Sequence, residues 1–240
     1  MVGSVLDGQV AVMVGASSGM GRATARALAA AGAKTVLAAR NGEALRSLAA
    51  EIGGSSLPVV TDVGDRQSVN RLIEESIGRF GRLDILVYAT GTNIPDRSLL
   101  VLSDETWNMM LQTNLTGAFW CTTAVLPAMR QQGNGLIIYL STGAVQKPDV
   151  SGVAYQASKH GLSGLAHGTF SEEQQHGIRT TVIFPGLTET PMLARRPTPT
   201  PPEVVAMALQ PEDVAAACLF VASLPSRARV PEMVLLPSGL

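Results

Sequence analysis

Tyr155 and Lys159 are the two residues whose types and spacing most directly suggest chemistry. They lie in the segment 152–162, GVAYQASKHGL, of a chain with only 4% aromatic and 15% charged residues. On a helix, side chains four residues apart share a face. A neighbouring ammonium favours phenolate over phenol, so we expect Lys159 to lower the pKa of Tyr155 from its ordinary value of about 10. Such a phenol can donate a proton to a carbonyl oxygen or take one from an alcohol. A Tyr-x-x-x-Lys pair by itself is also common on helix surfaces.

A glycine-rich turn, VGASSGMGRATA, follows the apolar run 9–14 and leads into an alanine-rich helical segment. Glycines in such a turn let backbone N–H groups approach a pyrophosphate, and the following helix adds the positive end of its dipole. A glycine trio can also be a purely structural loop, but its place between a strand and a helix favours a dinucleotide site. We expect the cofactor to bind the turn residues Gly15, Ser17, Ser18, Gly19, Met20 and Gly21.

Short apolar runs alternate with longer segments of helical period along the whole chain. This alternation is typical of a parallel sheet with helices on both faces. The 240 residues are 46% hydrophobic and show neither an internal repeat nor a linker, so we expect one domain over residues 1–240. The predicted fold is α/β, a single-domain Rossmann fold whose doubly wound parallel sheet has about seven strands. The predicted strands are 9–14, 34–39, 56–60, 84–89, 135–140, 179–184 and 232–237.

Further motifs follow the glycine-rich turn in a fixed order: TDV at 61–63, NLTG at 114–117, YLSTG at 139–143, YQASK at 155–159 and PGLTETP at 185–191. This series resembles the short-chain dehydrogenase/reductase (SDR) family over nearly the whole chain. The resemblance implies an oxidoreductase, a carbonyl reductase or ketoreductase, that interconverts a ketone or aldehyde and an alcohol by hydride transfer with a nicotinamide cofactor. Two alternatives stay open on the same fold: a catalytically silent dinucleotide-sensing regulator, and an isomerase or dehydratase.

The resemblance also implies roles for the residues around the tyrosine. Tyr155 is the expected proton donor and acceptor, and Lys159 is expected to hold the nicotinamide ribose as well. Asn114 matches the asparagine that holds a water linking the lysine to solvent, although its side-chain amide can instead brace a helix. The family has a serine hydroxyl thirteen residues before the tyrosine, where this chain has Thr142, with Ser141 one position earlier. We therefore expect Thr142 to polarise the carbonyl and keep Ser141 as the alternative.

The end of the second predicted strand, TVLAARN, bears on the choice of cofactor. A carboxylate there would favour NAD(H), but this chain has Ala39 followed by Arg40, whose guanidinium suits a 2′-phosphate. NADP(H) is therefore expected over NAD(H). By resemblance, Asp62 accepts a hydrogen bond from the adenine amino group beside Val63, although an aspartate here can also cap the next helix. The other cofactor-binding residues that the family implies are Gly91, Pro185, Gly186, Thr188 and Thr190, together with Tyr155 and Lys159.

Two long loops are expected to enclose the substrate, because both follow strands at one edge of the sheet. One covers residues 90–104. The other, the predicted substrate lid at about 187–208, is rich in proline, and a stiffened surface connection is its alternative interpretation. Arg195 and Arg196 in the lid leave room for an anionic substrate. The pocket is expected to be mostly apolar. Its predicted lining is Asn93, Ala144, Val145, Gln146, Val150, Leu187, Met192 and Leu193.

Composition argues against several other classes of protein. The formal net charge of −1 is spread along the chain, so no nucleic-acid partner is expected. No apolar run is long enough for a membrane span, and no signal segment is visible. Cys121 and Cys218 are predicted to be buried thiols in the reducing cytoplasm, and neither they nor the three histidines have the spacing of metal ligands. The small-residue face of the segment 154–168 suits close helix packing about a symmetry axis, which predicts a homotetramer or homodimer.

Overall fold

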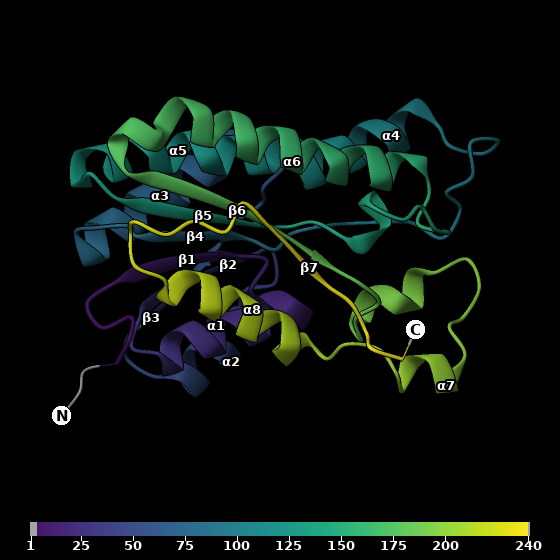
Figure 1. Ribbon diagram of the computed structural model, residues 1–240, viewed down its shortest axis with the longest axis horizontal. Helices are drawn as coiled ribbons and strands as arrows, with labels where there is room; N and C mark the ends of the chain where they lie inside the picture. Colours follow the sequence, from purple (N-terminus) through teal and green to yellow (C-terminus); the bar gives the residue numbers. More distant parts are fainter. Residues whose placement is uncertain (1–3, 240) are drawn as a thin grey trace.

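The computed structural model describes residues 4–239 and contains a seven-stranded parallel sheet (Figure 1). Its strand order is β3-β2-β1-β4-β5-β6-β7, so the chain winds outward from β1 in one direction and then from β4 in the other. The doubly wound α/β fold predicted from the alternating pattern is confirmed. The strands are β1 (Val10–Val14), β2 (Lys34–Ala39), β3 (Ser56–Val60), β4 (Ile85–Tyr88), β5 (Gly135–Leu140), β6 (Ile178–Pro185) and β7 (Glu232–Leu235).

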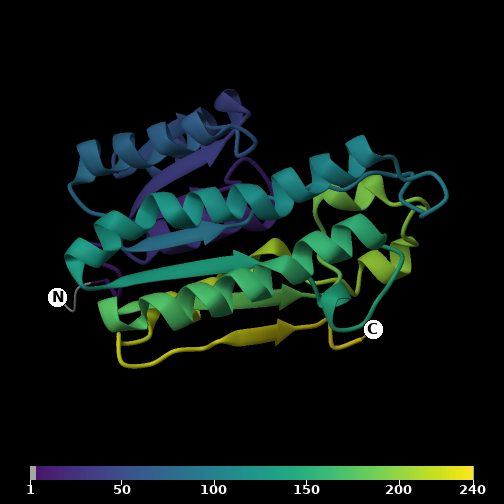
Figure 2. The same cartoon turned by 90° about the horizontal axis from the view of Figure 1, so that it is seen from above.

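Helices cover both faces of the sheet, as Figures 1 and 2 show from two directions. Helices α1, α2 and α8 pack on one face, and α3, α5 and α6 on the other. No helix within residues 4–239 has the length and apolar composition needed to cross a membrane. The helices are α1 (Gly19–Ala30), α2 (Gly42–Ile52), α3 (Arg66–Phe80), α4 (Asp104–Leu111), α5 (Gly117–Gln132), α6 (Val153–Glu173), α7 (Pro202–Val205) and α8 (Pro211–Ser223).

The central strand β1 explains why the apolar runs are uninterrupted. Successive side chains of a strand point to opposite faces of the sheet, and here both faces are covered. Val10, Val12 and Val14 join the core beneath α3, α5 and α6, whereas Ala11 and Met13 join the core beneath α1, α2 and α8. Each of these five side chains is at most 1% exposed. A polar residue at any of them would lie in one core or the other.

The strand register brings the carboxyl ends of the central strands to one edge of the sheet. Val14 of β1 lies opposite Ala38 of β2 and Tyr88 of β4, and Tyr88 lies opposite Tyr139 of β5. Loops that are far apart in the sequence therefore leave the sheet side by side at this edge. The turn after β1, the loop after β4 and the loop after β6 all start there, which is where the sequence predicts the site.

Candidate active site

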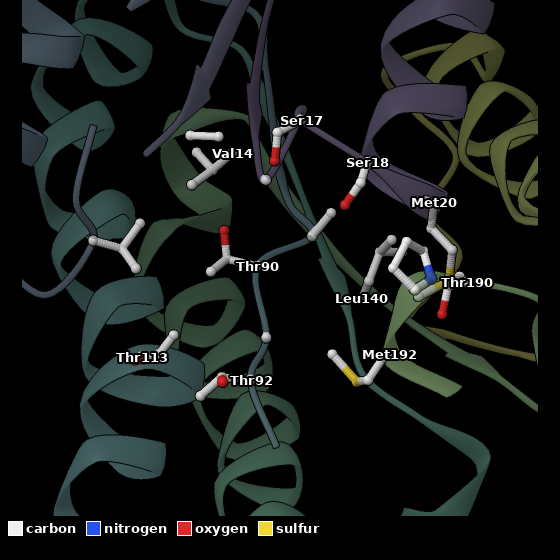
Figure 3. A pocket seen from close by; sticks show the side chains of 18 of the residues that line it. Val14, Ser17, Ser18, Met20, Thr90, Thr92, Thr113, Leu140, Thr190 and Met192 are labelled. Carbon is white, nitrogen blue, oxygen red and sulfur yellow. The ribbon is translucent and has the colours of Figure 1, made fainter. Parts of the chain in front are cut away.

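A cavity of about 330 Å³ opens at the carboxyl edge of the sheet. Figure 3 shows its walls, with Ser17, Thr90 and Thr92 on one side and Met20, Thr190 and Met192 on the other. The structure thus brings the glycine-rich turn and the Tyr-Lys pair to one cavity. The predicted site residues that line it are Gly15, Ser17, Ser18, Gly19, Met20, Gly21, Arg40, Asp62, Val63, Gly91, Ser141, Tyr155, Lys159 and Thr190.

The glycine-rich turn is folded too tightly for side chains at two of its glycines. Gly15 has φ +96°, and a methyl group on it would lie 2.9 Å from the Ala89 carbonyl carbon. A methyl group on Gly21 would overlap the Gly15 carbonyl oxygen. Ser18, at the start of α1, makes no side-chain cap, and the first turn of α1 holds no acid. The first N–H groups of the helix therefore remain available to an anion in the cavity, which fits a dinucleotide pyrophosphate.

The residues after β2 and β3 form the far end of the cavity. Ala39, Arg40 and Asn41 line it, and Asn41 also caps α2 by accepting a hydrogen bond from the Ala44 N–H at 3.1 Å. Asp62 lines it too and accepts from the Gly64 N–H at 2.8 Å. The residue that caps α3 is Asp65, so the alternative role of Asp62 as the helix cap is wrong. No carboxylate follows β2, and the carboxylate that lines this end of the cavity is that of Asp62, after β3.

Tyr155 and Lys159 are both buried on α6, 9% and 3% exposed. The Lys159 ammonium lies 6.0 Å from the centre of the Tyr155 ring and donates hydrogen bonds to the carbonyl oxygens of Leu140, at 2.8 Å, and of Thr90, at 3.5 Å. Gly91 leaves room for this arrangement, because a methyl group on it would lie 3.2 Å from the Lys159 Nζ. The lysine therefore joins the ends of β4 and β5 to α6.

Burial controls the acidity of both side chains. It raises the pKa of Tyr155 to about 12, with a further increase from the charge of Asp149 and a decrease from Arg97. It lowers the pKa of Lys159 to about 8. The prediction that Lys159 lowers the pKa of Tyr155 is wrong in this structure, because loss of water around the phenol outweighs a cation whose hydrogen bonds point to backbone carbonyls. Tyr155 is therefore a protonated phenol at neutral pH.

The two candidate hydroxyls, Ser141 and Thr142, have different hydrogen-bond states. Ser141 is 3% exposed, lines the cavity and donates its proton to the Lys159 carbonyl oxygen at 3.1 Å. Thr142 is only partly buried, and its hydroxyl oxygen accepts a hydrogen bond from the Ala144 N–H at 3.3 Å. Within residues 4–239, no acceptor binds the Thr142 hydroxyl proton. The hydroxyl proton of Thr142 is thus unbonded among the described residues and that of Ser141 is bonded, but of the two residues only Ser141 lines the cavity.

Asn114 is fully buried in a π-helical turn, Gln112–Thr116, between α4 and α5. Its side-chain oxygen accepts from the Thr92 N–H at 2.7 Å, and its amide donates to the Thr92 carbonyl and to the Ser158 hydroxyl at 3.1 and 2.9 Å. These contacts match the bracing role that the sequence left open. They tie the loop after β4 to α6 one residue before Lys159.

Three predicted cofactor residues after β6 do not line the cavity. Thr188 is 6% exposed, donates to the Gly186 carbonyl oxygen at 3.0 Å and pairs with Leu209. Gly186 packs against the C-terminal segment, where a methyl group on it would lie 2.8 Å from Pro237 Cδ. Pro185 is the last residue of β6, paired with Leu235. Thr190 does line the cavity, and its Cγ2 would lie 3.2 Å from a methyl group on Gly19.

Several lining residues were missed by the sequence reasoning. Most of them lie at or just after the end of a strand at the carboxyl edge, or in the predicted lid, and that position was the signal available for finding them; Thr113 lies instead in the π-helical turn between α4 and α5. A motif match selects residues of distinctive type and passes over plain threonines, alanines and leucines in the same positions. The missed residues are Asn41, Thr61, Ala89, Thr90, Thr92, Thr113, Leu140 and Pro191.

The substrate side of Tyr155 is mostly apolar. Tyr155 packs with Met110 and Ala154, and the partly buried side chains of Ile94, Leu102, Trp107 and Met192 cover this cluster. Of the predicted substrate lining, Met192 reaches the main cavity and Val150 lines a second cavity of about 310 Å³ beside it. Val145 packs against the core instead. Asn93 is buried and donates to the Ser151 carbonyl oxygen at 2.9 Å. The others predicted, Ala144, Gln146, Leu187 and Leu193, line neither cavity.

The structure also describes the two cysteines and the side chains that could bind a metal ion. Cys121 and Cys218 are buried and unpaired, and burial raises the pKa of each thiol to about 12. Neither is therefore a thiolate nucleophile at neutral pH. In the part of the chain from 4 to 239, no three histidine, cysteine, aspartate or glutamate side chains are grouped so that they could hold a metal ion.

Known proteins share this fold and sequence pattern. Residues 9–200 match the family model described as short chain dehydrogenase. An uncharacterized oxidoreductase of Staphylococcus haemolyticus is 32% identical over 233 residues, covering 97% of this chain and 98% of that protein. A 3-oxoacyl-(acyl-carrier-protein) reductase of Synechocystis is 34% identical over 233 residues, 95% of this chain and 94% of that protein. The crystal structure of a metagenomic short-chain oxidoreductase in complex with NADP superposes with a TM-score of 0.85 at 31% identity, covering 98% of this chain and 99% of its own.

Proposed function

The chain belongs to the short-chain dehydrogenase family and is an oxidoreductase of the class that acts on CH–OH and C=O groups with NAD(P), and we propose that it reduces a ketone or aldehyde with NADPH, using Tyr155 as the proton donor. The observation that carries the proposal is the position of a buried, protonated phenol on α6 in the same cavity as the glycine-rich turn. Neither feature alone separates an enzyme from a dinucleotide-binding protein. Together they put an acid where a cofactor and a carbonyl would meet.

The proposed chemistry divides between the cofactor and the side chains. A reduced nicotinamide, when bound, supplies the hydride. Tyr155 donates its proton to the carbonyl oxygen as negative charge develops there, and transfer is favourable because an alkoxide is a stronger base than a phenolate. Thr142 donates a hydrogen bond to the same oxygen, keeps its own proton and stabilises that charge. Lys159, whose pKa is about 8, places a cation near the phenolate that remains.

The cavity end after β2 supports NADP(H) over NAD(H). Ala39 stands where an acid would bind the ribose hydroxyls, and Arg40 beside it offers a guanidinium to a 2′-phosphate. The solved relative in complex with NADP agrees with this choice. Asp62 lines the same end of the cavity, where we propose that it accepts a hydrogen bond from the adenine amino group. We therefore propose that Arg40 contributes most of the discrimination between the two cofactors.

Spectrophotometry tests the proposed reaction. NADPH and NADH are each mixed with the protein and a panel of aryl, aliphatic and cyclic ketones, and absorbance of the reduced cofactor is followed. We expect turnover with NADPH to exceed that with NADH. If no carbonyl is reduced with either cofactor while NADPH binds tightly, the dinucleotide-sensing alternative replaces this proposal.

A Tyr155→Phe variant tests the proton donor. It should bind NADPH as the wild type does and lose about 10²–10⁴-fold in rate, the range that general acid catalysis contributes. Tyr139→Phe is a matched control, because Tyr139 is fully buried and its hydroxyl contacts Thr122 in the core, away from the cavity. An undiminished rate in Tyr155→Phe would remove Tyr155 from the mechanism.

We also propose that the protein is a homotetramer or homodimer. Large apolar side chains are exposed on α5 (Phe119), α8 (Phe220) and β7 (Val234), at 44%, 52% and 45%. Of the small residues of α6, Gly161 packs on Leu115 of the same chain, where a methyl group would lie 2.5 Å away, whereas a methyl group on Gly164 or Gly168 would meet nothing within 4 Å. Light scattering after size-exclusion chromatography measures the mass, and a mass of 25.1 kDa, one chain, would contradict the proposal.

A further inference from the structure

Arg97 is a buried arginine in the loop after β4, only 8% exposed. Its guanidinium donates to the backbone carbonyl oxygen of Arg195 in the lid, and its Nε lies 3.5 Å from the Pro95 carbonyl oxygen. Among the described residues, no carboxylate forms an ion pair with it. Burying a guanidinium whose partners are backbone carbonyls is costly. Such a residue needs an explanation that core packing does not supply.

The lid also contacts the loop after β4, through the side chain of Arg195. Arg195 directs its guanidinium back to the loop after β4, with NH1 3.1 Å from the Thr92 hydroxyl and 3.5 Å from the Asn93 carbonyl oxygen. The two arginines therefore cross between the same two loops in opposite directions. At the other end of the lid, the Glu189 N–H donates to the Leu209 carbonyl oxygen at 2.8 Å, so the base of the lid is closed by backbone pairing. The Arg97 and Arg195 contacts hold its middle.

A third segment meets Arg97 at the start of α6. Gly152, the residue before the helix, has φ +84°, and a methyl group on it would lie 2.8 Å from Arg97 Cγ. Asn93 reaches the same segment by donating to the Ser151 carbonyl oxygen. Tyr155 lies one turn into this helix. Arg97 thus touches the lid and the N-terminus of the helix that carries the proposed proton donor.

The charges around Arg97 come from the lid and from the segment that leads into α6. Asp149 attracts its guanidinium, Arg196 repels it, and Tyr155 is close enough to be influenced by it. Arg196 in turn lies 4.0 Å from Asp149. The same segments carry Met192, the lid residue that covers the apolar cluster around Tyr155. Displacing the lid would therefore uncover the substrate side of Tyr155.

We propose that Arg97 is a positioning residue that fastens the substrate lid to the loop after β4 and to the start of α6, and so keeps the substrate side of Tyr155 covered. The proposal rests on the proposed function for its kinetic consequence, but the lid contact itself does not depend on turnover. Arg97 does not touch the reacting atoms. Its effect is expected on substrate retention more than on proton transfer.

Hydrogen exchange of the NADPH-bound protein tests the contact without any substrate. In Arg97→Ala, we expect amide exchange of the lid segment 190–197 to rise about tenfold, which corresponds to about 1.4 kcal/mol. The increase should be confined to the lid and the start of α6. Arg227→Ala, at an exposed position outside all three segments, is the matched control. Unchanged exchange in the lid, or an increase spread evenly over the sheet, would overturn the proposal.

Kinetics and chemical rescue separate positioning from plain loss of stability. With the carbonyl compound that the wild type reduces best, KM should rise about tenfold, equivalent to about 1.4 kcal/mol, while kcat changes less. Added ethylguanidinium should refill the space in Arg97→Ala and restore both KM and lid protection. A positioning role would be contradicted if ethylguanidinium gave no rescue and kcat fell by as large a factor as KM rose.

Two further variants keep the proposal testable if Arg97→Ala does not fold. Arg97→Lys keeps the charge but has one point donor in place of the planar guanidinium, so it should show a smaller increase in lid exchange. Arg195→Ala removes the reciprocal contacts of an exposed side chain, which also lines the cavity, and should loosen the lid in the same direction. Wild-type lid exchange in both variants would overturn the proposal. If the wild type reduces no carbonyl, the proposed function fails while the exchange test still decides the role of Arg97.

Discussion

Replacing Lys159 by methionine is expected to stabilise the folded protein at neutral pH while removing its activity. Burial lowers the pKa of Lys159 from 10.5 to about 8. At about 1.4 kcal/mol per pH unit, holding this charge in the folded protein at pH 7 costs about 3 kcal/mol. Methionine removes that cost but leaves the Leu140 and Thr90 carbonyl oxygens without the ammonium, at about 1 kcal/mol for each lost hydrogen bond. The expected net gain is about 1 kcal/mol.

The pH dependence of this difference is the more specific signature. The folded-state pKa lies below the unfolded value, so the cost is fully present below pH 8. As pH rises from about 8 to 10.5, the unfolded chain keeps a proton that the folded protein has lost, and the wild type becomes more stable relative to the variant. Over this pH range the free energy of unfolding of the wild type should rise by about 3 kcal/mol relative to that of Lys159→Met. The variant should therefore be the more stable protein at pH 7 and the less stable one at pH 10.5.

Urea unfolding followed by circular dichroism measures both free energies at several pH values. Subtracting the free energy of unfolding of the variant from that of the wild type cancels the contribution of every titratable group that the two proteins share. Lys147→Met, the same substitution at an exposed lysine, is the control for loss of a positive charge. A stability difference that stays constant from pH 7 to pH 10.5 would refute the conclusion that Lys159 carries a buried, destabilising charge.

Four other substitutions test the hydroxyl, the cofactor preference and the glycine-rich turn. Thr142→Ala should lower kcat by about 10²–10³-fold, as loss of a donor to a developing oxyanion does. Ser141→Ala should lower kcat less, because the Ser141 hydroxyl is bonded to the Lys159 carbonyl oxygen. If steady-state kinetics gave the reverse order, Ser141 would be the residue that polarises the carbonyl. Ala39→Asp should shift the ratio of kcat/KM for NADPH and NADH towards NADH, because its carboxylate would face a 2′-phosphate; an unchanged ratio would show that NADP(H) is not recognised there. Gly21→Ala should lower the free energy of unfolding, measured with denaturant, by about 1–3 kcal/mol, since its methyl group would overlap the Gly15 backbone. The same variant should bind NADPH more weakly in calorimetry. Wild-type values in both measurements would contradict the close packing of the turn.

The order of strands and helices followed from the sequence because it depends on local patterns. Apolar runs such as 9–14 are continuous since both faces of the sheet are covered, and the glycine-rich turn identifies the first connection. The strand boundaries differ by one or two residues, as with β6, which extends from Ile178 to Pro185 where 179–184 is predicted. The expected lid at 187–208 begins and ends at a β-bridge between Thr188 and Leu209. Between these two residues it contains only short helical turns.

The site divides differently between sequence and structure. Position in the chain was enough to bring Tyr155, Lys159 and the glycine-rich turn to one cavity, because parallel strands end at one edge. It was not enough for Pro185, Gly186 and Thr188, which the C-terminal segment and the base of the lid draw away from that cavity. Their neighbours come from residues some twenty to fifty positions later, which no motif at 185–191 describes.

By itself the sequence determined the α/β fold, the family and the identity of the proposed proton donor, because strand and helix periods and motif spacing are local properties of the chain. Only the tertiary structure decided the acidity of Tyr155 and Lys159, the different hydrogen-bond states of Ser141 and Thr142, and the contact of Arg97 with the lid. Each of these depends on how much water is removed from a group and on which distant backbone atoms replace it. Those atoms come from loops that meet only when the strands have been aligned in the sheet.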